Sequence, residues 1–321
     1  MGSCTSPMII RNNKGEPESV PCGMCEDCRL EKASQWASRC VHEAQMYKHN
    51  SFITLTYAPE HLPPDHSVHK NELTEFIRKL RRSEYYPGSM PIFDNAMRLQ
   101  YYRAKWHKKY REVKTQKEGK LIRFYGCGEY GEKLGRPHYH VLLFNHDFKD
   151  KEILRGQQLS WTKTHFTQGN IHTLYKSETL EKIWGKGFCT IGEVTYDSAG
   201  YVARYIRKKV LGDINVQADH YNGKHPEFAL MSRMPGIGLP WLKKYLTDVY
   251  PKDFFTINGI RKRPPRFYDD YLAKCNPTLY EELKTKRKEA IVEEDSKRMY
   301  ERSKHRKLIT QPLIRSLENG N

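Results

Sequence analysis

Short strand-like runs and helical repeats of apolar positions alternate along most of the chain. Runs rich in β-branched and aromatic residues predict strands over residues 52–57, 121–127, 138–144 and 187–194. Apolar side chains recur three or four positions apart in residues 72–82, which predicts a helix. Further helices are predicted over residues 30–47, 94–115, 198–211 and 279–307. Because strands and helices mix without strict β-α-β alternation, we expect an α+β fold with a mainly antiparallel central sheet and flanking helices.

These patterns divide the chain into three parts. Residues 1–48 are predicted to form an N-terminal arm with a cysteine-rich knuckle and a helix, residues 1–20 being loose. Residues 49–250 contain the predicted sheet and are expected to be the functional core. The chain is expected to be irregular after Gly212, and residues 251–321 are predicted to be a basic, charged C-terminal extension.

Composition narrows the class of partner. Lys and Arg number 55 against 38 Asp and Glu, which gives a formal charge of +17, and aromatic residues make up 12% of the chain. A basic chain rich in rings suits a polyanion whose bases can stack, so we expect nucleic acid rather than a membrane. No run approaches the ~18 apolar residues of a membrane span. The eight cysteines are few and unevenly spaced, which favours a reducing compartment, and the cytoplasm is the expected location.

The first chemical motif lies on two of the predicted strands. His138 and His140 are two positions apart, so on a strand both imidazoles face the same side while Tyr139 faces the other. A Gly-rich connection, GEYGEKLGRP, predicts that their strand pairs with the preceding one, which brings Glu129 within reach. Two imidazoles and a carboxylate can bind a divalent metal ion. An isolated His-x-His is more often two half-buried histidines on a sheet, and this alternative stays open.

The second motif lies on the predicted helix 198–211. Tyr201 and Tyr205 are four positions apart on one helix face, and Lys208 follows on the same side. Two phenol hydroxyls and an ammonium on one helix face are unfavourable in a protein core, because each would need a hydrogen-bond partner. The common alternative to a functional role is an amphipathic helix whose tyrosine rings pack against the core. A phenol near cations and a metal-bound phosphate can act as a nucleophile. Together the two motifs predict metal-dependent cleavage of a phosphodiester, which leaves a 5′-phosphotyrosyl bond and a 3′-hydroxyl.

The order of these motifs resembles that of the HUH-superfamily rolling-circle replication initiators. The matching segments are Phe52–Tyr57, Glu129 with Pro137–His140, and Tyr201-x-x-x-Tyr205-x-x-Lys208. Two further segments, Pro21–Arg29 and Met231–Gly238, are similar to the initiators of small single-stranded DNA phages of the microvirus group, in its gokushovirus-like branch. The resemblance covers about residues 20–245.

The resemblance implies a nicking and joining endonuclease on a sheet of about five strands, with a ferredoxin-like or RRM-like layout. It implies Mg²⁺ or Mn²⁺ bound by His138, His140 and Glu129, although Glu132 lies in the same loop and could compete with Glu129. The expected partners are single-stranded DNA at a replication origin and host replication proteins. A helicase is expected among them, because the chain has no Gly-x-x-x-x-Gly-Lys-[Ser/Thr] loop for a motor of its own.

The same resemblance assigns the catalytic side chains of the helix. Tyr205 is the expected nucleophile, Lys208 its supporting cation and Tyr201 the second nucleophile, while the order in which the tyrosines act stays open. Two other functions remain as alternatives. One is a non-catalytic single-stranded nucleic-acid-binding protein with a zinc knuckle, and the other is an HUH relaxase or transposase of another mobile element.

Three cysteines near the N-terminus form a separate cluster. Cys22, Cys25 and Cys28 have spacings suited to a structural Zn²⁺, and the fourth ligand could be Cys40, Cys4 or His42. A reduced, metal-free turn before the helix is the alternative.

Aromatic and basic residues alternate in the predicted helix 94–115. Lys105, Trp106 and Lys109, together with Arg204 near the tyrosine motif, are candidate contacts to single-stranded DNA. Packing of the rings on the sheet, with the cations in water, is an equally good interpretation.

Overall fold

The structure is a computed structural model of the chain. It describes residues 4–11, 15–85, 121–131, 134–154, 173–203 and 221–292, and every structural statement below concerns these residues.

Seven strands form the central sheet, in the order β6-β7-β8-β3-β5-β4-β9, and each neighbouring pair is antiparallel. This confirms the predicted α+β class, but the number of strands exceeds the expected five or so. Two of the strands, β6 and β7, have only two residues each and are too short to show a pattern, and β9 lies where an irregular chain was expected. The bounds are β3 (Asn50–Thr56), β4 (Arg123–Tyr130), β5 (Pro137–Phe144), β6 (Glu152–Ile153), β7 (Tyr175–Lys176), β8 (Cys189–Gly192) and β9 (Phe228–Met231).

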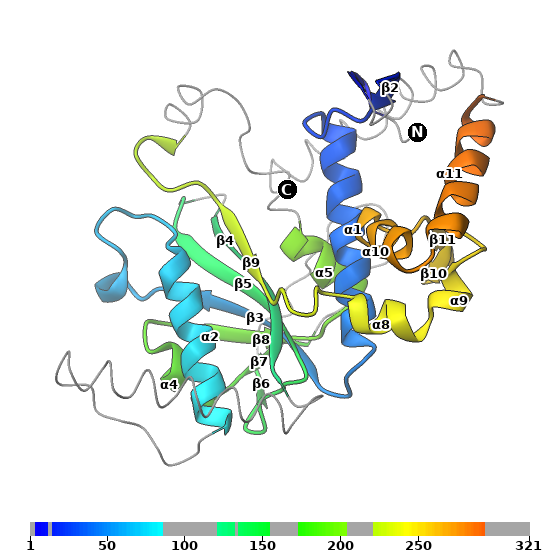
Figure 1. Ribbon diagram of the computed structural model, residues 1–321. Coiled ribbons are helices and arrows are strands. Elements are labelled where there is room, and N and C mark those ends of the chain that lie inside the picture. The colour runs from blue at the N-terminus through cyan, green and yellow to red at the C-terminus, as the bar shows by residue number, and fades with distance from the viewer. Residues whose placement is uncertain are drawn as a thin grey trace, which may run out of the picture.

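Helices cover both faces of the sheet (Figure 1). One face packs against α2 (Lys70–Tyr85) and α4 (Glu178–Trp184), and the other against α1 (Glu26–Ala44) and α5 (Tyr196–Ala203). A short 3₁₀ turn, η1, spans Pro59–His61. The sheet is therefore the middle layer of three, and alternate residues of its central strands face different helices.

The helix α2 shows how the apolar repeat produces packing. Leu73, Phe76, Ile77 and Leu80 are all buried against the sheet, as their spacing predicts. The helix begins at Lys70 and ends at Tyr85, two and three residues beyond the predicted range 72–82. Such small shifts at helix ends follow from capping geometry, which the apolar repeat does not determine.

The chain beyond the sheet forms a second cluster of short elements. They are α8 (Leu239–Lys244), α9 (Leu246–Val249), β10 (Phe255–Ile257), β11 (Ile260–Lys262), α10 (Arg266–Cys275) and α11 (Pro277–Val292). Their apolar side chains, among them Trp241 and Tyr268, make a third core next to the C-terminal half of α1. The expectation of irregular chain after Gly212 is therefore wrong over this region. No helix in the described part of the chain is both long and apolar enough to cross a membrane.

The N-terminal arm is more ordered than predicted. Strand β1 (Met8–Arg11) pairs antiparallel with β2 (Pro17–Val20), so a loose arm is the wrong description of these two segments. This hairpin lies beside the first turn of α1 (Figure 1). All four residues of β1 are exposed, so the hairpin has little core of its own.

A buried ion pair connects α1 to the sheet. The carboxylate of Glu43, which is fully buried, pairs with the guanidinium of Arg123 on β4. Its second oxygen accepts a hydrogen bond from the amide of Gly238 at 2.7 Å, and Arg123 donates to the carbonyl of Pro235 at 2.7 Å. The segment Met231–Gly238, which matched the phage initiators in sequence, is thus held against both α1 and β4.

Candidate active site

The hairpin of β4 and β5 brings the three predicted metal ligands together. In its register Glu129 lies opposite His138, and Cys127 lies opposite His140. The antiparallel hairpin predicted from the Gly-rich connection is therefore confirmed. Tyr139 packs in the core on the α2 side, so it faces away from the two imidazoles as the strand alternation predicts.

The three side chains converge on one point. The Oε1 atom of Glu129 lies 3.3 Å from Nε2 of His138 and 3.1 Å from Nε2 of His140. The side chains of Glu129 and His140 are 2% and 3% exposed, whereas that of His138 is 17% exposed. The cluster is thus buried on its inner side and reaches solvent at His138.

Two outer hydrogen bonds orient the rings. Nδ1 of His140 lies 2.9 Å from Oγ1 of Thr54, which is its register partner on β3. Nδ1 of His138 lies 3.1 Å from the carbonyl oxygen of Arg136. Engaging each Nδ1 in this way leaves each Nε2 directed at Glu129, which is how metal-binding histidines are held in proteins. Sequence reasoning missed Thr54, because only the register of β3 against β5 places it beside His140.

The donor set fits a divalent cation. One carboxylate oxygen and two imidazole nitrogens lie within 4.8 Å of one another, on a single face of the sheet. Carboxylate oxygen is a ligand that Mn²⁺ and Mg²⁺ prefer, and imidazole adds affinity for the transition metal. Among the described residues, Glu129 provides the carboxylate next to the two histidines. Glu132, the other candidate, lies outside the described residues.

The helix α5 places a tyrosine against this cluster. Thr195 and Ser198 cap its first turn reciprocally, each side-chain oxygen accepting the other residue's amide hydrogen, at 3.1 and 2.8 Å. Ala199 and Val202 are buried on the sheet, which turns the half-buried Tyr201 toward β5. The ring of Tyr201 lies edge-on to that of His140, with centroids 4.9 Å apart.

Several predicted residues lie outside the described residues. They are Tyr205, Lys208, Arg204, Lys105, Trp106 and Lys109. Their proposed roles stay predictions from the sequence.

The predicted cysteine cluster forms, and the structure adds a fourth member. The sulfur atoms of Cys22, Cys25 and Cys28 gather with that of Cys4. Cys40 and His42, the other two residues considered as fourth ligand, are buried elsewhere. Cys40 packs in the core between α1 and the sheet, and the ring of His42 stacks on Trp241.

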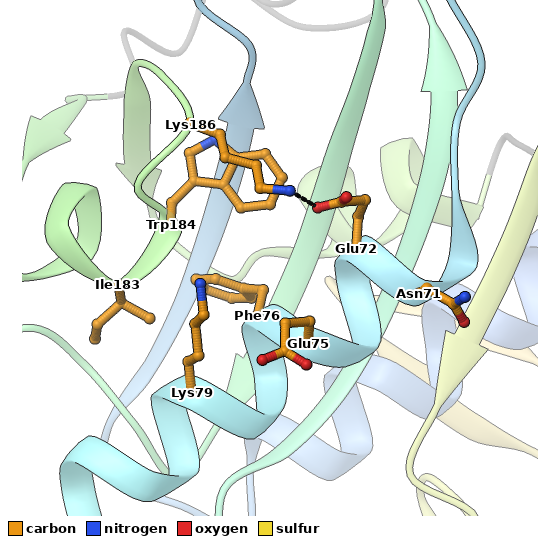
Figure 2. Close-up of a pocket in the computed structure, with 8 residues that line it drawn as sticks. All are labelled: Asn71, Glu72, Glu75, Phe76, Lys79, Ile183, Trp184 and Lys186. Carbon is orange, nitrogen blue, oxygen red and sulfur yellow. Dashed lines mark hydrogen bonds and ion pairs between the residues drawn. The ribbon is translucent and has the colours of Figure 1, made fainter. Parts of the chain in front are cut away.

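A pocket of about 250 Å³ lies on the opposite face of the sheet from the histidines, between α2 and the end of α4. Figure 2 shows the ammonium of Lys186 paired with the carboxylate of Glu72 at its edge. Trp184 forms one wall and packs on the α2 side of the core. The candidate active site is therefore separate from this pocket.

Comparison with known proteins agrees with the motifs. The family model described as replication-associated protein ORF2/G2P matches residues 85–210, which include all three cluster residues and both tyrosines. The chain is 31% identical over 269 residues to replication-associated protein VP4 of Bdellovibrio phage phiMH2K, covering 84% of this chain and 72% of that protein. The chain belongs to this family of microvirus replication-associated proteins.

Two further relatives give the same result. Replication-associated protein ORF2 of Spiroplasma virus 4 is 32% identical over 261 residues, covering 78% of this chain and 67% of that protein. Replication-associated protein ORF4 of Chlamydia phage 1 is 26% identical over 257 residues, and there the match spans about half of the relative, 54%. No solved structure matches this replication-associated protein.

Proposed function

We propose that this protein initiates rolling-circle replication by nicking, and later rejoining, one DNA strand at the replication origin. The observation that carries the proposal is the meeting of Glu129, His138 and His140 with the ring of Tyr201 at one place on the sheet. The relatives support it, because each is named as a replication-associated protein of a phage or virus. They also favour an initiator over a relaxase or transposase.

Glu129, His138 and His140 would hold Mg²⁺ or Mn²⁺. When bound, the cation would draw charge from a non-bridging phosphate oxygen and align the scissile bond. Thr54 and the Arg136 carbonyl hold the two imidazoles in the orientation that binding requires. The partial exposure of His138 gives a phosphate access to the cluster from solvent.

The tyrosines would supply the nucleophile. In the proposed step the phenolic oxygen forms a bond to phosphorus, and the bond from phosphorus to the 3′-oxygen breaks. The phenol loses its proton and the 3′-oxygen gains one, so the products are a 5′-phosphotyrosyl bond and a 3′-hydroxyl. Because one phosphodiester replaces another, the reverse step rejoins the strand without ATP. Tyr201 and Tyr205 allow two such steps, and Lys208 is the proposed supporting cation.

The rest of the chain would bind single-stranded DNA. The formal charge of +17 attracts the phosphate backbone, and Lys105, Trp106, Lys109 and Arg204 are the proposed contacts. A host helicase would unwind the duplex ahead of the nick. With these partners, the bacterial cytoplasm is the proposed location.

The test uses labelled single-stranded DNA that carries the origin of the genome encoding this chain, with Mn²⁺ present. On a denaturing gel, DNA labelled at its 3′ end should give a slowly migrating protein adduct, whereas DNA labelled at its 5′ end should give a free, shorter product. A chelator should abolish both products. The double variant of Tyr201→Phe with Tyr205→Phe should lose the adduct, and the two single variants should show which phenol attacks first.

A second pair of variants separates chemistry from binding. His138→Ala with His140→Ala should reduce cleavage by at least about 100-fold, yet change the salt-dependent binding by less than about threefold, because binding rests on Lys and Arg. His49→Ala with His61→Ala, which alters two exposed histidines, is the matched control. Tight binding by the wild-type protein without any adduct would instead favour the non-catalytic alternative.

A further inference from the structure

Four cysteines meet where the N-terminal hairpin joins α1. Cys4 precedes β1, Cys22 and Cys25 lie in the turn between β2 and α1, and Cys28 is in the first turn of α1. All four thiols are free, and their sulfur atoms lie within 4.8 Å of one another. This group, called the thiol cluster below, belongs to α1 and the hairpin rather than to the β4–β5 site.

The spacing of the sulfur atoms matches a tetrahedral metal site. The sulfurs of Cys25 and Cys4 are 3.8 Å apart, and those of Cys22 and Cys28 are 4.0 Å apart. A tetrahedral zinc ion with Zn–S bonds of about 2.3 Å requires sulfur–sulfur distances of about 3.8 Å. A disulfide would need about 2.05 Å, so these pairs are too far apart to be bonded. The sulfurs are therefore arranged around a centre rather than in two pairs.

The backbone of the turn is also arranged for thiolates. The amides of Met24 and Cys25 donate hydrogen bonds to the sulfur of Cys22 at 3.4 and 3.2 Å. The amide of Cys22 donates to the sulfur of Cys4 at 3.3 Å. Gly23 makes this turn with a φ of +74°, a conformation that a side chain would strain. Amide hydrogens directed at sulfur stabilise its negatively charged, metal-binding form.

The hairpin needs such a cross-link more than most elements do. A two-stranded hairpin is marginally stable in water, and β1 buries none of its four residues. Ile9, for example, is 77% exposed. With little core of its own, the hairpin depends on its connection to α1, which carries the buried Glu43 and packs on α5.

We propose that Cys4, Cys22, Cys25 and Cys28 bind a structural Zn²⁺ that joins the β1–β2 hairpin to the start of α1. The ion is held entirely by protein thiolates, as in structural zinc sites. Catalytic zinc sites instead keep one coordination position open. It is independent of the divalent cation proposed for the histidine cluster. Loss of the zinc should release the β1–β2 hairpin while α1 stays packed on α5.

The zinc content of the full-length protein tests this proposal. It is measured in the His138→Ala/His140→Ala background, so that the histidine cluster adds no zinc. Protein made with zinc in the medium should contain about one zinc per chain. Adding Cys4→Ser should lower this several-fold, whereas adding Cys275→Ser, which alters an exposed cysteine outside the cluster, should leave it unchanged. Replacing zinc by Co²⁺ should give the visible spectrum of a tetrahedral thiolate complex.

A second measurement uses the wild-type protein, so it tests the zinc proposal even if a cysteine variant fails to fold. A strong chelator should release the zinc and make the cluster thiols reactive, while the far-ultraviolet circular dichroism of the helices persists. Trypsin should then cut after the exposed Arg11 at least about tenfold faster. A folded protein with less than about a tenth of a zinc per chain, iron in place of zinc, or unchanged zinc in the Cys4→Ser variant would overturn the assignment.

Discussion

The ring of Tyr201 on α5 meets the ring of His140 on β5 edge to face, with their centroids 4.9 Å apart and their planes at 89°. Phe52 on β3 completes the contact, because its ring stacks on His140 at 5.7 Å and lies edge-on to Tyr201 at 6.4 Å. A phenol from a helix and an imidazole from the sheet therefore share one wall. This arrangement underlies the proposed function, since a phosphate at the cluster would lie next to the helix that carries Tyr201.

Thr54→Val tests whether the outer hydrogen bond of His140 positions the metal ligand. Valine keeps the shape of the side chain but removes the oxygen that lies 2.9 Å from Nδ1 of His140. We expect the affinity for Mn²⁺ to fall about 10- to 100-fold, as for other outer hydrogen bonds of metal ligands. Isothermal titration calorimetry with Mn²⁺ measures this affinity. Thr74→Val removes an exposed helix hydroxyl and should leave the affinity for Mn²⁺ unchanged. An equal loss of Mn²⁺ affinity in the two variants would argue against the positioning role of Thr54.

Glu43→Ala tests the ion pair that connects α1 to β4. The change leaves the guanidinium of Arg123 buried without its carboxylate and removes the acceptor of the Gly238 amide. We expect the free energy of unfolding to fall by about 3–5 kcal/mol. Denaturant titration of both proteins measures the difference. Glu75→Ala breaks an exposed ion pair with Arg78 on α2 and should cost at most about 1 kcal/mol.

Gly238→Ala tests the close approach of the Met231–Gly238 segment to α1. Gly238 has a φ of +81°, and an added Cβ would lie 2.4 Å from the hydroxyl of Tyr268. Gly223 has nearly the same φ, +80°, but nothing within 4 Å of such a Cβ. Gly223→Ala should therefore cost about 1 kcal/mol from backbone strain alone. Gly238→Ala should cost clearly more, and similar midpoints of thermal unfolding for the two variants would contradict this.

His42 should make the protein less stable in mild acid. Burial lowers the pKa of His42 to about 3, from 6.5 for a free side chain. Between these values the unfolded chain binds a proton that the folded chain does not. The free energy of unfolding should therefore fall as the pH drops below about 6.5, by up to about 1.4 kcal/mol per pH unit from this residue.

Comparing stability at about pH 7 and about pH 5 in wild type and His42→Phe measures this contribution. Phenylalanine keeps the stacking on Trp241 but cannot titrate, so the variant should lose part of the pH dependence. It should also lose some stability at every pH, because the hydroxyl of Tyr268 loses its partner at 2.9 Å. His61→Gln, at an exposed position, should keep the wild-type slope, and an unchanged slope in His42→Phe would show that other groups cause it.

Sequence reasoning succeeded where the physics is local. The alternation of a strand is enough to place His138 and His140 on one face and Tyr139 on the other, and the Gly-rich connection is enough to bring Glu129 to the same point. It failed for elements without a strong period, such as the two-residue strands β6 and β7 and the exposed strand β1. These depend on pairing with neighbours that lie elsewhere in the sequence.

What this chain's sequence determined by itself is the set of chemical groups and their local direction, because side-chain alternation and helix spacing are properties of a few consecutive residues. Only the tertiary structure decided which distant groups meet. It placed Thr54 behind His140, Tyr201 against the same ring, and Cys4 rather than Cys40 or His42 with the thiol cluster. The register between strands and the packing of α1 on the sheet settle these contacts, and both arise from burying apolar surface over the whole chain.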